Sequence, residues 1–194
     1  MKNNNNAAKK NIAIFASGKG SNAQKIIDHF RTSDLINVGL IVCNNAEAGV
    51  LQIAEKENIS SLIIESKKFN TDGYLSEINT HKIDLIVLAG FLWKITSALI
   101  QSYQNKIINM HPALLPKFGG KGMYGLKVHQ AVINSKEKES GITIHYVDEI
   151  YDHGKIIFQA KCTVDENDTP QSLAEKIHVL EHKHYSSIIE KIIV

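Results

Sequence analysis

The 194-residue chain has little cysteine, little proline and a single tryptophan. Its two cysteines, Cys43 and Cys162, lie in separate apolar stretches and form no Cys-x-x-Cys pair. A zinc ribbon or a dithiol redox centre is built on such closely spaced thiols. A free cysteine in an apolar segment usually behaves as a small buried hydrophobic residue. We therefore expect two reduced, buried, structural thiols and no redox or zinc chemistry.

The sequence also lacks a strong excess of charge and a long hydrophobic run. The formal net charge is +2 at pH 7, which indicates neither nucleic acid nor an acidic membrane surface as a partner. No apolar run approaches the ~20 residues that a transmembrane helix needs. The N-terminal segment MKNNNNAAKK has no apolar core of the kind found in secretory signals. We expect residues 1–10 to be a disordered leader and the protein to be cytoplasmic.

Apolar, β-branched segments alternate along the chain with helical patterns. The expected strands are residues 11–16, 36–43, 62–64, 84–89, 107–110, 141–147 and 155–164. The expected helices are residues 22–30, 48–57, 73–80, 97–103, 126–135 and 170 to nearly 194. This alternation predicts an α/β fold whose mostly parallel sheet is covered by helices on both faces. No repeat or linker divides the chain, so we expect one domain over residues 11–194.

Ligands of such sheets bind beside the carboxyl ends of the strands. The segments 18–22, 91–95 and 109–111 and the loop around Asp152 all follow expected strands. Residues that are distant in the sequence are therefore expected to meet in one crevice.

A glycine-containing turn, SGKGSN at residues 17–22, joins the first strand to the first helix. Glycine lets the backbone approach an anion closely, and a helix N-terminus offers unpaired N–H groups. The spacing matches neither a Walker A loop nor a complete GxGxxG motif, because Lys25 stands in the place of the third glycine. We interpret the turn as a phosphate-binding loop. The alternative is a tight turn with a Ser or Asn helix cap.

The segment IINMHPALLP at residues 107–116 is the most informative of the chain. Asn109 and His111 lie two residues apart in an expected strand, so both side chains point to the same side. An amide beside an imidazole suits a reaction at a carbonyl, because one group holds the nucleophile and the other stabilises the oxyanion. The alternative is a structural histidine near the end of a strand.

The acidic turn DEIYDHG at residues 148–154 follows the strand GITIHYV, which should lie beside the strand of Asn109. A carboxylate brought to His111 would raise the pKa of the imidazole and favour its protonated, oxyanion-stabilising form. Asp152 is the candidate for this role. The alternative is an ordinary solvated loop.

Histidines recur near the C-terminus in the pattern His178-x-x-Glu181-His182-x-His184. His178 and His182 lie one helical turn apart, a spacing that can bind a metal ion. No third ligand of suitable geometry is evident, so we interpret them as solvated helix histidines.

In combination, these segments resemble those of the phosphoribosylglycinamide formyltransferase (glycinamide ribonucleotide transformylase) family. The resemblance rests on GKGSN at 18–22, LAGF at 88–91, INMHPALLPKFGGKG at 108–122, GITIHYVDEIYDHG at 141–154, and Glu181, His182 and Tyr185. It implies a Rossmann-like formyltransferase fold. It implies transfer of the formyl group of 10-formyltetrahydrofolate, a cosubstrate, to the amine of glycinamide ribonucleotide in purine biosynthesis. It also implies small-molecule substrates, no metal, and a monomer or weak homodimer.

The resemblance assigns roles residue by residue. His111 would stabilise the oxyanion and act as general acid, Asn109 would hydrogen-bond the formyl oxygen, and Asp152 would hold and charge His111. The ribonucleotide would be held by Gly20, Ser21, Asn22, His178 and Glu181. The folate pocket would be lined by Asp72, Leu92, Trp93, Lys94, Ile95, Asp148, Glu149, Ile150 and Tyr151.

Four features depart from the family pattern, and one of them is His153, which replaces a frequent glycine beside Asp152. Trp93 stands where an arginine is common. Asp72 stands where several relatives place a folate-contacting arginine, and Lys67 or Lys68 is the expected substitute. The loop 117–125 is longer than in the shortest relatives, and we expect it to reshape the rim of the site rather than the chemistry.

Three other functions are kept as alternatives. Methionyl-tRNA formyltransferase shares the Asn-x-His and Asp pattern but has a further basic C-terminal domain, and formyltetrahydrofolate deformylase usually has an extra N-terminal domain. We expect neither domain in this chain. A non-catalytic nucleotide-binding module would use the GKGSN turn alone and would not need Asn109, His111 and Asp152 together.

Overall fold

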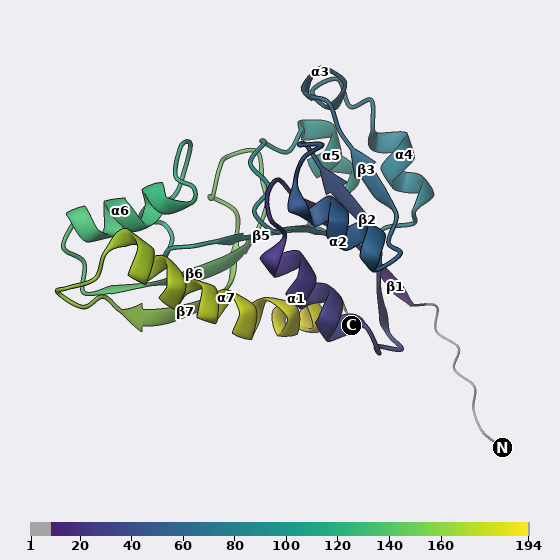
Figure 1. Ribbon diagram of the computed structural model, residues 1–194. Helices are drawn as coiled ribbons and strands as arrows, with labels where there is room; N and C mark the ends of the chain where they lie inside the picture. Colours follow the sequence, from purple (N-terminus) through teal and green to yellow (C-terminus); the bar gives the residue numbers. More distant parts are fainter. Residues whose placement is uncertain (1–8, 194) are drawn as a thin grey trace.

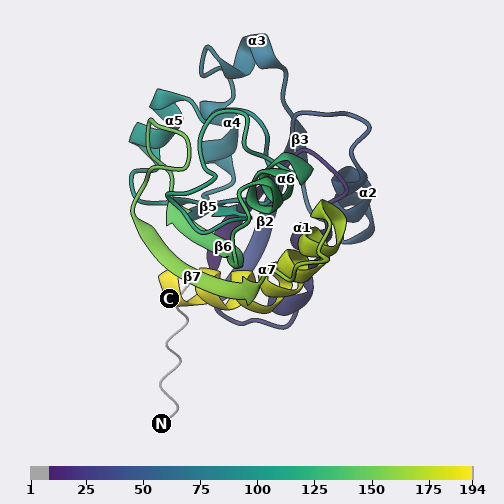
Figure 2. The ribbon, with the colours of Figure 1, turned by 90° about the vertical axis from the view of Figure 1, so that its left-hand side faces the viewer.

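The fold is built around one seven-stranded sheet with helices on both faces, as a computed structural model of residues 9–193 shows (Figures 1 and 2). The strand order is β3-β2-β1-β4-β5-β6-β7. The strands are β1 (Lys10–Ala16), β2 (Ile36–Cys43), β3 (Ser61–Ile63), β4 (Leu85–Leu88), β5 (Ile107–His111), β6 (Glu139–Tyr146) and β7 (Ile156–Thr163). The helices are α1 (Ser21–Phe30), α2 (Gly49–Lys56), α3 (Ser66–Phe69), α4 (Leu75–Thr80), α5 (Ser97–Ser102), α6 (Leu126–Asn134) and α7 (Pro170–Ile193).

The sheet is parallel over its first five strands and antiparallel at one end. β1 pairs in parallel with β2 and β4, β2 with β3, and β4 with β5, whereas β6 runs antiparallel to both β5 and β7. Parallel neighbours need crossover connections, which here run through the helices, whereas β6 and β7 are joined directly. The predicted mostly parallel α/β sheet is confirmed.

Two hydrophobic cores lie on opposite faces of the sheet, and β1 contributes to both. Ile12 and Ile14 point into a core with apolar residues of α1, α2, α6 and α7. Ala13 and Phe15 point to the other face, into a core with residues of α3, α4 and α5. All four side chains are fully buried. Successive side chains of a strand alternate between faces, so a strand covered on both sides reads as a continuous apolar run.

The predicted elements differ from the observed ones in a few places. Lys10, which we placed in the leader, begins β1, and residues 1–8 of the predicted leader lie outside the described residues. The helix α3 is not predicted, because its four residues show no helical period. Cys43 is buried as expected, but Cys162 is only partly buried; both are free thiols.

The strand order creates a crevice between β1 and β4. The chain proceeds from β1 outward through β2 to β3, then returns to β4 and proceeds to β5 on the other side. The loops after β1 and β4 therefore lead in opposite directions, an arrangement that opens a binding site at the carboxyl ends of the strands. Among residues 9–193, no helix combines the length and the apolar character that crossing a membrane requires.

Candidate active site

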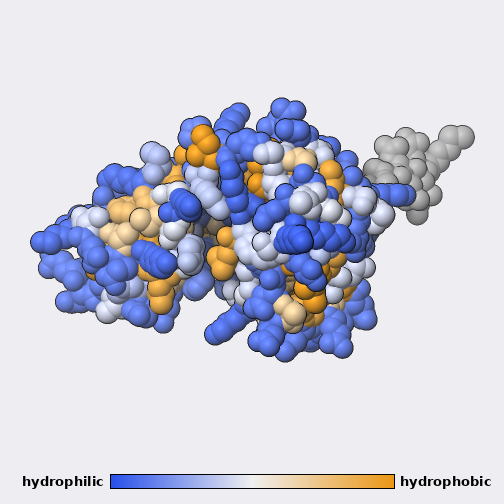
Figure 3. Space-filling view, turned by 90° about the horizontal axis from the view of Figure 1, so that it is seen from above, coloured by the Kyte–Doolittle hydropathy of each residue, from blue (hydrophilic) through white to orange (hydrophobic). Residues whose placement is uncertain are grey.

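A cavity of about 720 Å³ lies at the carboxyl ends of β1, β4 and β5, within the size range of small-molecule sites. Its walls come from the turn after β1, the loop after β4, the end of β5, residues 120–126, the loop after β6 and the helix α7. Apolar side chains gather beside a hollow near the middle of this face (Figure 3). The predicted meeting of distant segments in one crevice is confirmed.

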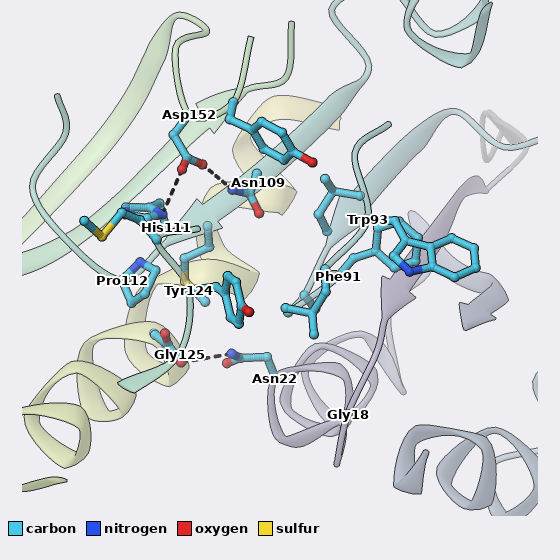
Figure 4. A pocket seen from close by; sticks show the side chains of 18 of the residues that line it. Gly18, Asn22, Phe91, Trp93, Asn109, His111, Pro112, Tyr124, Gly125 and Asp152 are labelled. Atoms are coloured by element: carbon cyan, nitrogen blue, oxygen red, sulfur yellow. Dashed lines mark hydrogen bonds and ion pairs between the residues drawn. The ribbon is translucent and has the colours of Figure 1, made fainter. Parts of the chain in front are cut away.

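His111 ends β5 and its side chain is buried. Its Nε2 lies 2.8 Å from the carbonyl oxygen of Phe118. Because a carbonyl oxygen only accepts, Nε2 carries a proton and donates it. The other ring nitrogen, Nδ1, lies 3.4 Å from Oδ2 of Asp152 (Figure 4). The imidazole is thus held between a backbone carbonyl and a carboxylate.

Asp152 reaches His111 by a path that differs from the expected one. Because β6 is antiparallel to β5, its end at Tyr146 pairs with Ile108, near the beginning of β5. The loop after β6 must therefore turn back along β5. Gly154 makes this turn possible, since a Cβ there would collide with the carbonyl oxygen of Tyr146. Asp152 itself has φ 54°, a left-handed conformation that Asp tolerates better than most residues.

The carboxylate of Asp152 is mostly buried and surrounded by donors. Its Oδ2 accepts a hydrogen bond from the backbone N–H of Gly120 at 2.9 Å. Burial raises the pKa of the Asp152 carboxyl, but His145, His111 and the Gly120 N–H together outweigh it, so this pKa lies below its ordinary value. Asp152 is therefore ionised at neutral pH.

Burial also decides the protonation of His111. It lowers the pKa of the imidazole, while the charge of Asp152 and the Phe118 carbonyl raise it, and the net direction is downward. The prediction that Asp152 by itself raises the pKa of His111 has the correct sign. Desolvation of the buried ring outweighs the carboxylate, so the protonated imidazole is less favoured in the resting protein than the charge of Asp152 alone would make it.

Asn109 lies opposite His145 in the pairing of β5 with β6. Its Nδ2 is 3.1 Å from Nε2 of His145 and 3.4 Å from Oδ1 of Asp152. His145 Nδ1 lies 2.9 Å from the Tyr146 carbonyl oxygen and must donate to it, so in the neutral ring Nε2 accepts from Asn109. Sequence reasoning did not identify His145. The position of GITIHYV beside the Asn109 strand was the signal that could have revealed it.

The turn after β1 presents the N-terminus of α1 to the cavity. Gly20, Ser21 and Asn22 line the cavity together with Gly18 and Lys19. Gly20 precedes α1 with φ 82°, and no side chain within residues 9–193 caps this end of the helix. The first N–H groups of α1 therefore have no side-chain partner and are available to an anion. The alternative of a Ser or Asn cap is not what the structure shows.

Gly20→Ala should destabilise this turn. The left-handed φ costs a non-glycine residue about 1–2 kcal/mol. The added Cβ would also lie 2.8 Å from Cδ1 of Ile53 and 2.9 Å from Cβ of Val50, so α1 and α2 must shift. We expect thermal unfolding to begin earlier, with Tm lower by roughly 5–15 °C. Gly18→Ala is the matched control, because its Cβ would meet nothing within 4 Å. Equal Tm values for the two variants would contradict this account.

Glu181, on α7, joins the turn after β1 to the C-terminal helix. The Glu181 side chain is buried, and its Oε2 accepts from Asn22 Nδ2 at 2.9 Å and from His178 Nδ1 at 2.7 Å. The bond to Glu181 raises the pKa of His178 despite partial burial. His178 is therefore not simply a solvated helix histidine. Among residues 9–193, no group of three His, Cys, Asp or Glu side chains is placed to hold a metal ion.

The loop after β4 forms an apolar wall of the cavity. Leu92, Trp93, Lys94 and Ile95 all line it. Trp93 packs against Phe69 and Phe91, with ring centroids 5.9 and 6.3 Å apart. The unexpected helix α3 thus supports this loop through Phe69, and the tryptophan that replaces a common arginine is held by aromatic contacts.

The loop after β6 forms another wall of the cavity. Two of the predicted folate-binding residues, Glu149 of this loop and Asp72, do not line the cavity. Asp148, Ile150 and Tyr151 line it, whereas Glu149 points away and accepts a hydrogen bond from Ser97 Oγ at 2.7 Å. Asp72 lies in the turn between α3 and α4, is exposed, and does not line the cavity. Its left-handed φ of 58° suits that turn.

The comparisons with known proteins agree with this geometry. A family model described as "Formyl transferase" matches residues 10–189. The chain is 37% identical over 190 residues to phosphoribosylglycinamide formyltransferase of Bacillus subtilis (strain 168), and the match covers 95% of each chain.

This chain belongs to the phosphoribosylglycinamide formyltransferase family. A chloroplastic phosphoribosylglycinamide formyltransferase of Arabidopsis thaliana is 40% identical over 93% of this chain, which spans 64% of the plant protein. A crystal structure of glycinamide ribonucleotide transformylase 1 from Geobacillus kaustophilus has a TM-score of 0.88 at 33% identity. That match covers 96% of this chain and 100% of the Geobacillus chain. The predicted Rossmann-like formyltransferase fold is confirmed.

Proposed function

We propose that this chain transfers the formyl group of 10-formyltetrahydrofolate to the amine of glycinamide ribonucleotide, a step of purine biosynthesis. One observation supports this most: Asn109, His111 and Asp152 converge in the same cavity as the free N-terminus of α1. A carbonyl-reaction site and an anion site thus lie within reach of one phosphorylated amine. The family membership adds the identity of the two substrates.

The ribonucleotide phosphate is placed at Gly20, Ser21 and Asn22. The N–H groups of the α1 N-terminus and its helix dipole favour a negatively charged group there. Glu181 and His178 then meet the rest of the ribonucleotide on the α7 side, because both line the cavity next to Asn22. This leaves the amine directed toward Asn109 and His111.

The folate lies between the two facing loops. Leu92 to Ile95 on one side and Asp148, Ile150 and Tyr151 on the other offer apolar surface and backbone groups. Leu92, Ile150 and Tyr151 line the cavity and are 54%, 60% and 40% exposed. Apolar side chains left exposed around a cavity are typical of a ligand site, because the ligand covers them.

The chemistry needs positioning, charge stabilisation and two proton movements. The amine attacks the formyl carbon and forms a tetrahedral intermediate whose oxygen carries a negative charge. His111 donates a hydrogen bond to that oxygen, and so does Asn109 Nδ2 when one of its two hydrogens is released from His145 or Asp152. The attacking nitrogen then loses a proton, N10 of the folate gains one, and the carbon–N10 bond breaks to release tetrahydrofolate. Asp152 and His111 are the neighbouring groups that can carry the proton between the two nitrogens.

The hydrogen bond between His111 and Phe118 must break before His111 Nε2 can bind the substrate. The Nε2 proton of His111 is donated to the Phe118 carbonyl, whose loop also contributes Gly120 N–H to Asp152. For Nε2 to bind the formyl oxygen, this oxygen must replace the Phe118 carbonyl. The loop 117–125 therefore bears on the reacting groups themselves, in addition to reshaping the rim.

A formyl-transfer assay with purified protein and 10-formyltetrahydrofolate, with and without glycinamide ribonucleotide, tests the proposal. We expect release of tetrahydrofolate only when the ribonucleotide is present. Release without it would instead show a deformylase. No release in either case would overturn the substrate pair. The proposal includes small-molecule partners, a cytoplasmic location and a monomer or weak homodimer, and light scattering on the purified protein would test the last of these.

A further inference from the structure

His129 is a buried histidine in the wall of the cavity that neither the sequence motifs nor the proposed mechanism uses. It lies in the first turns of α6, and its side chain is 4% exposed. It lines the cavity together with Asn22, Glu181 and His111. The charges of Glu181, His178 and His111 all act on its ring, so the histidine lies near both the α7 side of the cavity and the reacting groups.

The Nδ1 atom of His129 is buried and has no hydrogen-bond partner among residues 9–193. Three other buried side-chain atoms share this condition: Asn44 Oδ1, Ser140 Oγ and His182 Nε2. None of those three residues lines the main cavity, whereas His129 does. A buried polar atom without a partner destabilises a protein and calls for an explanation. His129 alone of the four lines the cavity, and its other ring nitrogen, Nε2, is not among these enclosed atoms and makes no hydrogen bond among residues 9–193, so Nε2 is the atom that a ligand in the cavity can reach.

The groups around His129 indicate which hydrogen-bonding groups such a ligand must carry. Both hydrogen bonds of the Glu181 carboxylate go to Oε2, so Oε1 is left to accept from a ligand. Burial lowers the pKa of His129 although Glu181 opposes this, so the ring is neutral and has one donor and one acceptor nitrogen. A carboxylate oxygen beside a neutral imidazole suits hydroxyl groups, which both donate and accept.

We propose that His129 is a ribonucleotide-binding residue that hydrogen-bonds a ribose hydroxyl, together with Oε1 of Glu181. The inference rests on the proposed function for the identity of the sugar phosphate. With the phosphate at the N-terminus of α1 and the amine at His111, the ribose is the part of the substrate that passes His129. His129 thus distinguishes a phosphorylated sugar from a bare phosphate.

The test compares His129→Leu with the wild type by calorimetric titration of two probes, ribose 5-phosphate and inorganic phosphate. Leucine removes both ring nitrogens with little change in volume. We expect the wild type to bind ribose 5-phosphate more tightly than inorganic phosphate. In His129→Leu, affinity for ribose 5-phosphate should fall about 5- to 100-fold, while affinity for inorganic phosphate stays within about twofold. The Tm of the empty variant should be unchanged or higher, because an unpaired polar atom has been removed.

His182→Leu is the matched control, since it removes a histidine that also has an unpartnered buried nitrogen but does not line the cavity. We expect it to leave both affinities within about twofold. Equal loss of the two ligands in His129→Leu, or no loss of ribose 5-phosphate, would overturn the inference. The titration does not depend on formyl transfer. The transfer assay could fail while His129→Leu still selectively loses affinity for ribose 5-phosphate. That result would overturn the proposed substrate pair but keep the sugar-phosphate site.

Discussion

His111→Ala should lower kcat/KM for formyl transfer by about 10²- to 10⁴-fold while leaving ribonucleotide binding nearly intact. The imidazole is the titratable ring at the reacting end of the cavity, held by Phe118 and Asp152. Its loss removes a hydrogen bond to the oxyanion and a route for the proton. The phosphate-binding turn lies at the other end of the cavity and keeps its N–H groups. Steady-state kinetics and titration with the ribonucleotide measure the two effects separately.

His153→Ala is the matched control for this substitution. His153 is exposed, pairs with Asp148 at 2.9 Å and does not line the cavity, so its loss should change kcat/KM by less than about threefold. Because His111 is buried, the variant must first be shown to keep its circular dichroism and a cooperative thermal transition. Activity within about threefold of the wild type in a folded His111→Ala protein would favour the non-catalytic nucleotide-binding module.

Most of the fold follows from apolar patterning, and its exceptions have identifiable physical causes. Residues 36–43 form a strand as predicted, because the apolar run 40–43 at its end fits a strand buried on both faces. The helix α3 was missed because four residues cannot show a helical period, and its formation depends on Phe69 packing against Phe91 and Trp93. Local sequence does not reveal tertiary contacts of this kind.

The part of the proposed site that could be predicted is the part in which two of its residues share a short segment. Asn109 and His111 are separated by the two-residue period of a strand, so their shared orientation could be read directly. His145 and His129 were missed because each sits singly in an apolar element, where a structural histidine is the ordinary interpretation. Their roles depend on which element packs opposite: β5 for His145, and the cavity beside α7 for His129. Asp72 was placed in the folate pocket because it stands at the sequence position of an arginine in several relatives. It does not line the cavity, because a matching sequence position does not determine the direction in which a turn points.

Asp152→Asn should lower kcat by about 10²- to 10³-fold and also displace the pH profile of the remaining activity. Asparagine has nearly the same shape, tolerates the left-handed φ of this position, and can still accept the Gly120 N–H. The substitution therefore removes mainly the negative charge. That charge opposes the effect of burial on His111, so without it the pKa of His111 falls further.

The sign of the displacement follows from the role proposed for His111. If the protonated imidazole supplies the proton, activity is lost as pH rises through the pKa of His111, and a lower pKa moves this alkaline limb to lower pH. Glu149→Gln is the control, because it removes a carboxylate from the same loop outside the cavity and should leave the limb in place. Since Asp152 and His111 interact closely, the apparent pKa values read from the pH profile describe the two groups together and neither one alone. An alkaline limb at the same pH in wild type and Asp152→Asn would show that the two groups are not coupled in the reaction, and Asp152 would then act only by holding Gly120 and the loop 117–125 in place.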